Sequence, residues 1–442
     1  MSKRIGIIIL CFLILGNVVA QKKLNYIEVD KMSYQLFLEK KWTELIDYST
    51  EARKQGIDFF YLEARTGIAW YNLKKYRTSA VWFLKAWEND QSFEWLQEYL
   101  YYSLVLGGRS AEAIKYAAGF TPAMKEKIGY SNSKITRVAL EVGYCFNPDF
   151  ESLTKSYSSS EYIGEDYGEA FYLKNYHFES FDLNHRVAPG LHINHNFTYL
   201  GINREQEIFW GDLNSFSIDI NQFQYFINPH ILIGKKFNIS PALSVVWGNS
   251  NYFTGGLRGN ANRFYTETDY RFSDIIFSTS VWSDFGNFKP GAEVNLANIY
   301  DEDFMQISAW VTVYPFSNTN FYLTPRIYFK ADNENSVNYN TFGISGGVQL
   351  GKVHFYGQYL NGDMENFVEA AGYVVSNFPG SSEQKFTGSL YFPLGKKQQL
   401  VLRYINQDVT EKYVVYSEGS YSRTEDYKYI KHTITAGISW NF

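Results

Sequence analysis

The chain has 442 residues, of which 45% are apolar, 20% charged and 19% aromatic, and its formal net charge is −5 at pH 7. Its mean hydropathy of −0.29 is too polar for a bundle of transmembrane helices, and past residue 20 no apolar run of about 18 residues occurs. The acidic balance also argues against binding to nucleic acid.

Residues 1–20 have the features of an export signal peptide. Lys3 and Arg4 supply a positively charged start, residues 5–19 form an apolar stretch, and small residues lead to a cleavage site after Ala20. The alternative, an N-terminal membrane anchor, would need a longer apolar stretch. After cleavage Cys145 is the one remaining cysteine, so we expect no internal disulfide.

Residues 21–130 predict a periplasmic domain of repeated helix pairs. Lys, Glu, Ala and Leu dominate, and apolar residues recur at helical spacing. A period of 34 residues relates three sets of positions: Leu36, Trp70 and Leu104; Tyr34, Ile68 and Tyr102; and Tyr48, Trp82 and Tyr116. About three such units are near the minimum that can bury a continuous core.

This helical period resembles the tetratricopeptide repeat. Gly67 and Ala86 match the small positions of that family, whereas Ser33, Tyr101 and Phe120 depart from them. The resemblance implies a concave surface that recruits a periplasmic protein or polymer. Its candidate contact residues are Trp42, Trp70, Tyr76 and Trp82. Alternatively, these aromatic residues only pack the helices together.

Residues 131–442 alternate between polar and apolar side chains, which predicts antiparallel strands. Short turns such as 234–237 and 351–352 alternate along the chain with polar segments that are mostly longer. These segments are 148–168, 203–213, 250–267, 300–304, 332–338, 361–384 and 407–429. About fourteen strands follow, near 136–147, 169–183, 190–202, 214–233, 238–249, 269–284, 288–299, 305–315, 320–331, 339–350, 353–360, 385–394, 398–406 and 431–442. A soluble β-sandwich, the alternative, would not need so many long strands or such sorted connections.

The last stretch, 431–442, carries Ile434, Ile438, Trp440 and Phe442 on one face and small polar residues on the other. It resembles the closing strand of bacterial outer-membrane β-barrels, which implies that Trp440 and Phe442 are recognised by the barrel assembly machinery. We therefore expect an α+β multidomain protein, with a tetratricopeptide-like helical solenoid followed by an antiparallel transmembrane β-barrel of about 14 strands. We expect the last strand to pair with 136–146.

The sequence also predicts how the barrel is oriented and what lines it. Short turns at one end of the barrel and long loops at the other are typical of outer-membrane barrels, whose short turns face the periplasm. With an even number of strands, the first and the last strand both end on the short-turn side. We therefore expect the helical domain to lie on the periplasmic side of a Gram-negative outer membrane. A charged Arg or Lys facing lipid at mid-membrane costs about 2–4 kcal/mol, so charges should face the lumen. The candidates are Arg137, Glu141, Lys174, Asp219, Glu293, Arg326, Lys330 and Arg403. They either brace the wall or select a passenger, and 361–384 could fold inward.

No catalytic, metal or cofactor motif is present, and His192 and His195 should lie on opposite faces of one strand. The architecture resembles exopolysaccharide exporters, surface lipoprotein assembly modifiers and YaiO-type outer-membrane proteins. It implies transport or secretion, most simply export of a polysaccharide or protein. The alternatives are a non-conducting scaffold or ligand-binding surface protein and, third, a lipid-modifying enzyme using a lipid-facing histidine such as His195 or His432.

Overall fold

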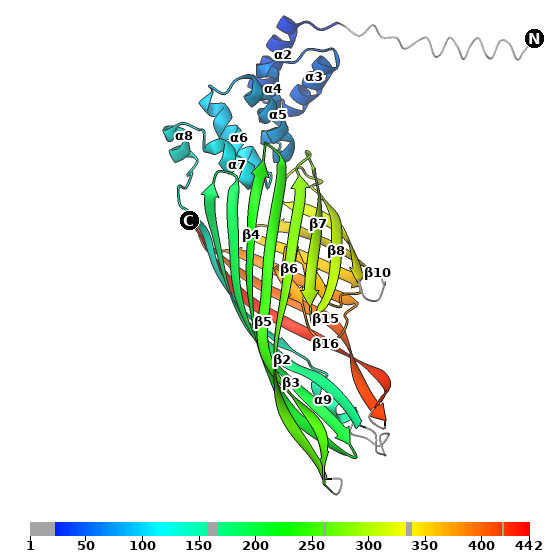
Figure 1. Cartoon of the computed structure of the whole chain (residues 1–442). Helices are drawn as coiled ribbons and strands as arrows, with labels where there is room; N and C mark the ends of the chain where they lie inside the picture. The colour runs from blue at the N-terminus through cyan, green and yellow to red at the C-terminus, as the bar shows by residue number, and fades with distance from the viewer. Residues whose placement is uncertain (1–22, 157–166, 260–261, 333–337, 418–419) are drawn as a thin grey trace, which may run out of the picture. The chain divides into compact units, whose positions relative to one another are not determined.

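The computed structural model of the chain describes residues 23–156, 167–259, 262–332, 338–417 and 420–442 (Figure 1). The predicted signal peptide, 1–20, lies outside the described residues, as do parts of the predicted loops 148–168, 250–267, 332–338 and 407–429. The chain divides into two compact units, Met1–Ser103 and Leu104–Phe442.

The first unit consists of antiparallel helices. They are α2 (Tyr26–Leu38), α3 (Trp42–Lys54), α4 (Phe60–Asn72), α5 (Tyr76–Asn89) and most of α6 (Glu94–Leu106). The first helices of successive pairs begin at residues 26, 60 and 94, so the helices repeat with the 34-residue period of the sequence. A Cβ atom on Gly67 would lie 2.7 Å from the ring of Phe83, so a larger residue would force this buried ring to move where α4 meets α5. That these helices are tetratricopeptide repeats stays a prediction.

One buried carboxylate in this unit makes its stability depend on pH. Glu63 is buried and accepts a hydrogen bond of 2.7 Å from Asn89 Nδ2. Burial, and next the charge of Asp58, raise the pKa of Glu63 above its ordinary value of 4.5. Because the unfolded chain has the ordinary pKa, ionisation of Glu63 costs stability as the pH rises through the raised folded value.

We therefore expect Glu63→Gln to raise the melting temperature of the helical unit near neutral pH, since the amide keeps an acceptor but carries no charge. The gain should shrink as the pH is lowered toward 4.5. Helical circular dichroism of the full-length protein measures this. The exposed Glu44→Gln is the control, and an equal gain in that variant would contradict the argument.

The second unit begins with α7 (Ser110–Ala117) and α8 (Pro122–Lys127) and continues as a sheet. Its wall strands are β1 (Ile135–Phe146), β2 (Tyr167–Ala188), β3 (Leu191–Trp210), β4 (Asp212–Ile233), β5 (Phe237–Arg258), β6 (Asn262–Ser283), β7 (Phe288–Ile299), β8 (Glu302–Val313), β9 (Phe321–Asp332), β10 (Asn338–Leu350), β11 (Val353–Gly362), β14 (Gln384–Pro393), β15 (Gln398–Ser417) and β16 (Ser420–Asn441). Over the described residues these fourteen antiparallel strands form one closed barrel.

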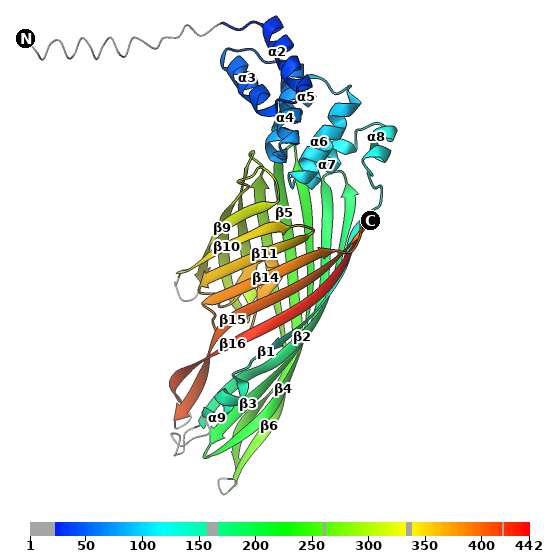
Figure 2. The same ribbon diagram turned by 180° about the vertical axis from the view of Figure 1, so that it is seen from behind.

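The barrel closes where the sequence predicts. β16 pairs with β1 from Arg137 opposite Asn441 to Phe146 opposite His432, and β1 pairs on its other edge with β2 (Figure 2). Trp440 lies opposite Val138, and the backbone N–H of Phe442 donates to the carbonyl of Thr136 (3.1 Å). The α+β class, with a helical region before a closed antiparallel barrel of 14 strands, and the pairing of the closing strand are thus confirmed.

The strands fall into two length classes. β2–β6, β15 and β16 have 20–22 residues, whereas β1, β7–β11 and β14 have 10–13. About 9–11 tilted residues cross a bilayer, so the long strands project beyond the wall at the long-loop end (Figure 1). The prediction of loops over 203–213, 250–267 and 407–429 is therefore wrong for most of their length. Beyond the lipid-facing belt the outward side chains need not be apolar, so the period-two signal fades there, although the inward side chains of β2, β15 and β16 still pack in an apolar cluster.

The outer wall is apolar where all strands run side by side. Leu140, Val142 and Tyr144 of β1 are 49%, 54% and 50% exposed, and Leu296, Phe329, Phe342 and Ile434 on other strands are exposed too. A contiguous exposed apolar belt around a closed barrel is the surface expected in contact with lipid. Among the described helices, none is long and apolar enough to span a membrane.

Candidate functional site

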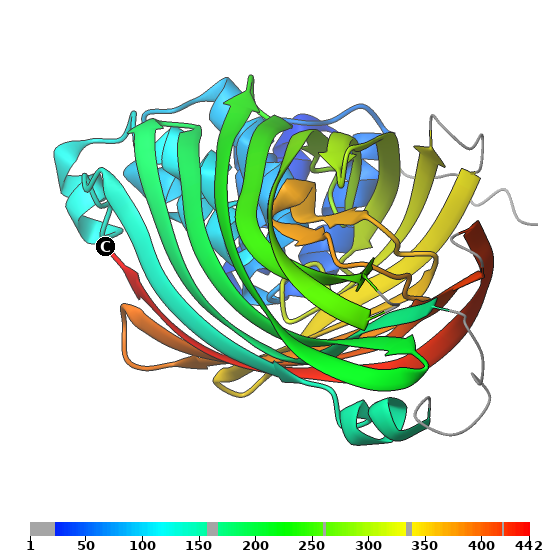
Figure 3. The same cartoon turned by 60° about the horizontal axis from the view of Figure 1, so that its bottom comes forward.

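A hairpin inside the barrel is the main feature of the lumen. Residues 363–383, hereafter the plug, contain β12 (Phe367–Glu369), the short helix η1 (Ala370–Gly372) and β13 (Val374–Ser376). Left-handed backbone at Ala370, Ala371 and Gly372 makes the tight turn between its two strands. Figure 3 shows this orange segment within the ring of wall strands. The long segment 361–384 thus folds inward.

Side-chain amides of the wall hold the plug by its backbone. Gln306 of β8 donates from Nε2 to the carbonyl of Val368 (2.6 Å) and accepts from the N–H of the same residue at Oε1 (3.2 Å). Gln224 of β4 donates to the carbonyl of Gly372 (3.0 Å). Each side-chain amide makes hydrogen bonds that a neighbouring strand would make in a sheet, so these buried backbone groups of the plug have partners.

Charged and hydroxyl groups add further anchors. Lys385 Nζ pairs with Glu369 Oε1 of the plug at 2.5 Å, and both side chains are buried. Lys330 Nζ donates to the carbonyl of Glu365 (2.6 Å). The hydroxyl of Tyr373 donates to Asp182 Oδ2 of β2 (3.1 Å). The plug is therefore fixed to opposite sides of the barrel.

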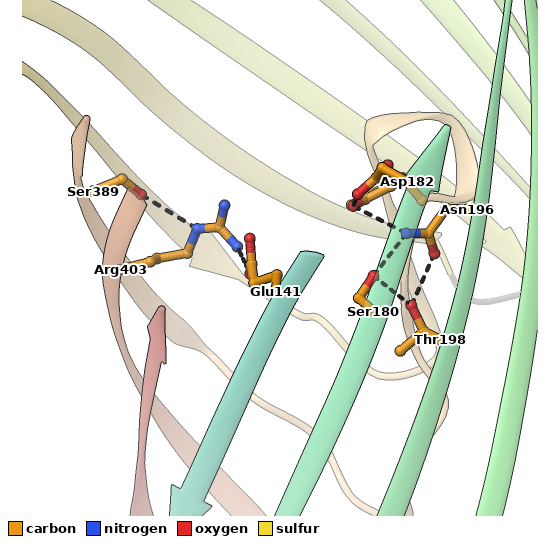
Figure 4. A network of polar contacts seen from close by, with 8 residues as sticks. Glu141, Ser180, Asp182, Asn196, Thr198, Ser389 and Arg403 are labelled. Atoms are coloured by element: carbon orange, nitrogen blue, oxygen red, sulfur yellow. Dashed lines mark hydrogen bonds and ion pairs between the residues drawn. The ribbon is translucent and has the colours of Figure 1, made fainter. Parts of the chain in front are cut away.

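Two ion pairs lie on the lumen wall among the predicted residues. Arg403 Nη1 of β15 contacts Glu141 Oε1 of β1 at 2.6 Å, and Arg403 Nε donates to the hydroxyl of Ser389 (Figure 4). Arg326 lies 3.9 Å from Glu293 Oε2 and packs over the ring of Trp310. These pairs join strands around the wall.

The structure places most, but not all, of the predicted lumen residues inward. Arg137, Glu141, Glu293, Arg326, Lys330 and Arg403 share the lumen face of their strands. The prediction is wrong for Lys174, because a β-bulge between Leu173 and Asn175 interrupts the alternation and leaves its side chain exposed. It is also wrong for Asp219, whose neighbours Ile218 and Ile220 line the lumen, so that Asp219 points outward.

Two cavities flank the plug. The larger, of about 720 Å³, has walls from β1–β6, β15 and β16 and is lined mainly by aromatic and aliphatic side chains, among them Phe171, Tyr176, Phe178, Ile202, Phe272 and Phe378. The smaller, of about 310 Å³, lies against β9–β11 and β14. Tyr373 and Val374 of the plug line both cavities. The plug tip therefore stands between them.

Beyond the ends of β1 and β14 the long strands close over the larger cavity. β15 pairs directly with β2 there, with Val414 opposite Glu169. Below this contact Arg204 and Glu411 form a buried ion pair, and the hydroxyls of Tyr427 and Tyr429 donate to Glu411 (2.8 and 2.7 Å). The sequence does not predict this cluster, because Arg204 and Glu411 lie in segments, 203–213 and 407–429, for which it predicts loops.

Lys431 of β16 also lines the larger cavity. It is not among the lumen residues that the sequence predicts, although the alternation of the last strand places it on the same face as Thr433 and Thr435. Its cross-strand neighbour on β15 is Gln407, which lines the same cavity.

The other predicted residues have these positions. In the helical unit Trp42 and Trp70 pack against a core that includes Leu36 and Leu45, Trp82 lies under the guanidinium of Arg53, and Tyr76 packs edge-on against Tyr71. A role of these rings in binding a partner stays a prediction. Trp440 and Phe442 lie at the seam, as described above, and their recognition during assembly is likewise still a prediction.

His192 and His195 do lie on opposite faces of β3. His192 shares the lumen face with Asn196, whereas His195 lies on the outer face beside Tyr225, whose hydroxyl is 2.8 Å from Nδ1. Across the described ranges of the chain, no group of three or more His, Cys, Asp or Glu side chains is arranged to hold a metal ion.

No family model and no curated protein matches the sequence. Among solved structures, the toluene transporter TodX of Pseudomonas putida is 8% identical, with 74% of this chain and 94% of that chain covered and a TM-score of 0.45. A FadL homologue of Pseudomonas aeruginosa is 9% identical, with the same coverage and TM-score. The translocator domain of the autotransporter NalP from Neisseria meningitidis is 8% identical, covers 77% and 99%, and has a TM-score of 0.30. At these values the likeness says nothing about what this barrel binds.

Proposed function

We propose that the protein is an outer-membrane transport barrel that passes small hydrophobic molecules through its lumen, with the plug as its gate. The observation that carries this proposal is the larger cavity, a space of about 720 Å³ lined mainly by aromatic and aliphatic side chains inside a membrane barrel. Ligand sites typically enclose about 300–1,000 Å³ with predominantly apolar walls.

The position of the two cavities supports a stepwise path. The larger cavity lies toward the projecting ends of β2–β5 and β15, and the smaller one lies nearer the short turns, with the plug tip between them. A molecule that leaves the first cavity for the second must displace Tyr373 and Val374. The short turns would face the periplasm in this proposal, and the helical unit would recruit a partner there.

Export of a polysaccharide or a protein, which the sequence resemblance implies, is not favoured by this lumen. A polymer needs a continuous polar passage, whereas here the plug crosses the lumen and the larger cavity is mainly apolar. The second candidate, a non-conducting ligand-binding surface protein, is supported by the many hydrogen bonds that fix the plug. It differs from a transporter in one respect, because its plug would never leave the lumen.

The proposal predicts saturable binding of a neutral apolar dye. We expect N-phenyl-1-naphthylamine to bind the purified protein in nanodiscs, measured by its fluorescence after subtraction of empty nanodiscs. Ile220→Trp, which fills the larger cavity, should weaken binding about tenfold, a loss of about 1.4 kcal/mol.

Ile227→Trp on the same strand is the matched control, because residue 227 lies on the outer face of β4. Binding that is absent from the wild-type protein, or that both substitutions change equally, would count against the cavity as the site.

A further inference from the structure

The charges around the larger cavity do not balance. Four cationic side chains line it: Arg204, Lys385, Arg403 and Lys431. The first three are in ion pairs, Arg204 with Glu411, Lys385 with Glu369 at 2.5 Å and Arg403 with Glu141 at 2.6 Å. Within the described part of the chain, Lys431 has no carboxylate oxygen within 4.0 Å of its ammonium. One positive charge in the lining is left over.

Lys431 is buried as well as without a partner carboxylate among the described residues. It is 7% exposed, and its ammonium lies 3.6 Å from the ring centroid of Phe378 in the plug. The face of an aromatic ring attracts a cation but does not neutralise it. A buried ammonium without a counter-ion is costly, and proteins usually pair such a charge.

A second unused donor lies beside it. Gln407 is the direct cross-strand neighbour of Lys431 and is 5% exposed. Its amide nitrogen is buried and has no hydrogen-bond partner in the described structure. Buried amides are normally satisfied, so two donors, one of them charged, lie side by side on the cavity wall without an acceptor from the part of the chain that the structure describes.

We propose that the larger cavity binds an amphiphile with a single negative charge, its anionic head between Lys431 and Gln407 and its apolar body along the aromatic lining. This inference rests on the proposed function and gives the class of its ligand. An acceptor-only group such as a carboxylate or sulfonate matches the two donors, the ammonium of Lys431 and the amide nitrogen of Gln407. Phe378 belongs to the plug, so the head group and the plug compete for the same ammonium.

The experiment compares two dyes that differ by one charged group. 1-Anilinonaphthalene-8-sulfonate and N-phenyl-1-naphthylamine share their rings, and only the first carries a sulfonate. Each is titrated into the full-length protein in nanodiscs of zwitterionic lipid. We expect Lys431→Met to weaken binding of the sulfonate at least tenfold and to leave binding of the neutral dye within twofold. Gln407→Leu should weaken binding of the sulfonate dye several-fold, and Lys431→Arg should retain binding of that dye.

Lys428→Met is the matched control, because Lys428 lies on the same strand but is exposed and does not line the cavity. Binding of the neutral dye shows that each variant is folded. If both dyes bind and Lys431→Met changes neither, the head-group site is wrong while the hydrophobic cavity stands. If neither dye binds the wild-type protein, the proposed function falls as well.

Discussion

Removing the plug is expected to open the barrel to ions. Residues 364–381 can be replaced by a short Gly-Ser linker, because the flanking strands β11 and β14 are already paired, with Asn361 opposite Gln384. Tyr373 and Val374 of the plug line both cavities, whose volumes are about 720 and 310 Å³, so removal of the plug is expected to join them. We expect single-channel conductance in planar bilayers to rise at least tenfold over the wild-type protein.

A substitution that weakens a single anchor of the plug is a milder variant to compare with this deletion. Gln306→Leu removes both hydrogen bonds to Val368 and leaves two buried backbone groups of the plug unsatisfied, at about 1–3 kcal/mol each. This variant should show brief openings rather than a stable pore. A folded barrel that stays closed without its plug would show that the plug is not the gate, and a ligand-binding surface protein would then be the better account.

Deleting Trp440, Asn441 and Phe442 is expected to abolish assembly of the barrel. β16 is hydrogen-bonded to β15 and to β1 at once, and the deleted residues pair with Arg137, Val138 and Gln398. Without them the edge of β1 is left unpaired at one end of the seam, and an unsatisfied backbone group in lipid costs several kcal/mol. The amount of heat-modifiable protein in the outer-membrane fraction measures assembly.

Asn441→Ala is the control for this deletion, because it keeps every backbone hydrogen bond of the seam and both aromatic side chains. It should assemble normally. The double variant Trp440→Ala and Phe442→Ala separates recognition of the aromatic rings from strand pairing. Wild-type levels of assembled protein after the deletion would refute the importance of the seam residues.

The barrel could be predicted because each wall strand needs apolar side chains on the face toward lipid and can carry polar side chains on the face toward the lumen. Leu140, Glu141 and Val142 alternate for that reason, and the same constraint fixes the strand count and the pairing of the last strand with the first. Where the strands extend beyond the membrane, this requirement ends and the polar–apolar alternation of the sequence weakens. The projecting parts of β5, β6 and β15 extend beyond the short strands of the wall, and their sequence suggests loops although they form regular hairpins.

The candidate site was only partly predictable for a related reason. Alternation gives the face of Arg403 and Glu141 but not that they meet across the seam, since that depends on the closure of the barrel. At Lys174 a single extra residue reverses the face, and no local pattern marks the bulge. The pair of Arg204 and Glu411 joins residues 207 positions apart, so it follows from the fold alone.

The way the plug is held has a consequence for how such a barrel can change its ligand. Gln306 bonds to the carbonyl and the N–H of Val368, and Gln224 bonds to the carbonyl of Gly372, and every residue except proline carries both groups. The wall thus recognises the path of the plug and not the identity of its side chains at these points. Side chains such as Val374 and Phe378, which face the larger cavity, can be exchanged without losing these bonds. At positions that are held only through the backbone, the ligand preference can therefore be re-engineered while these bonds to the plug are left intact.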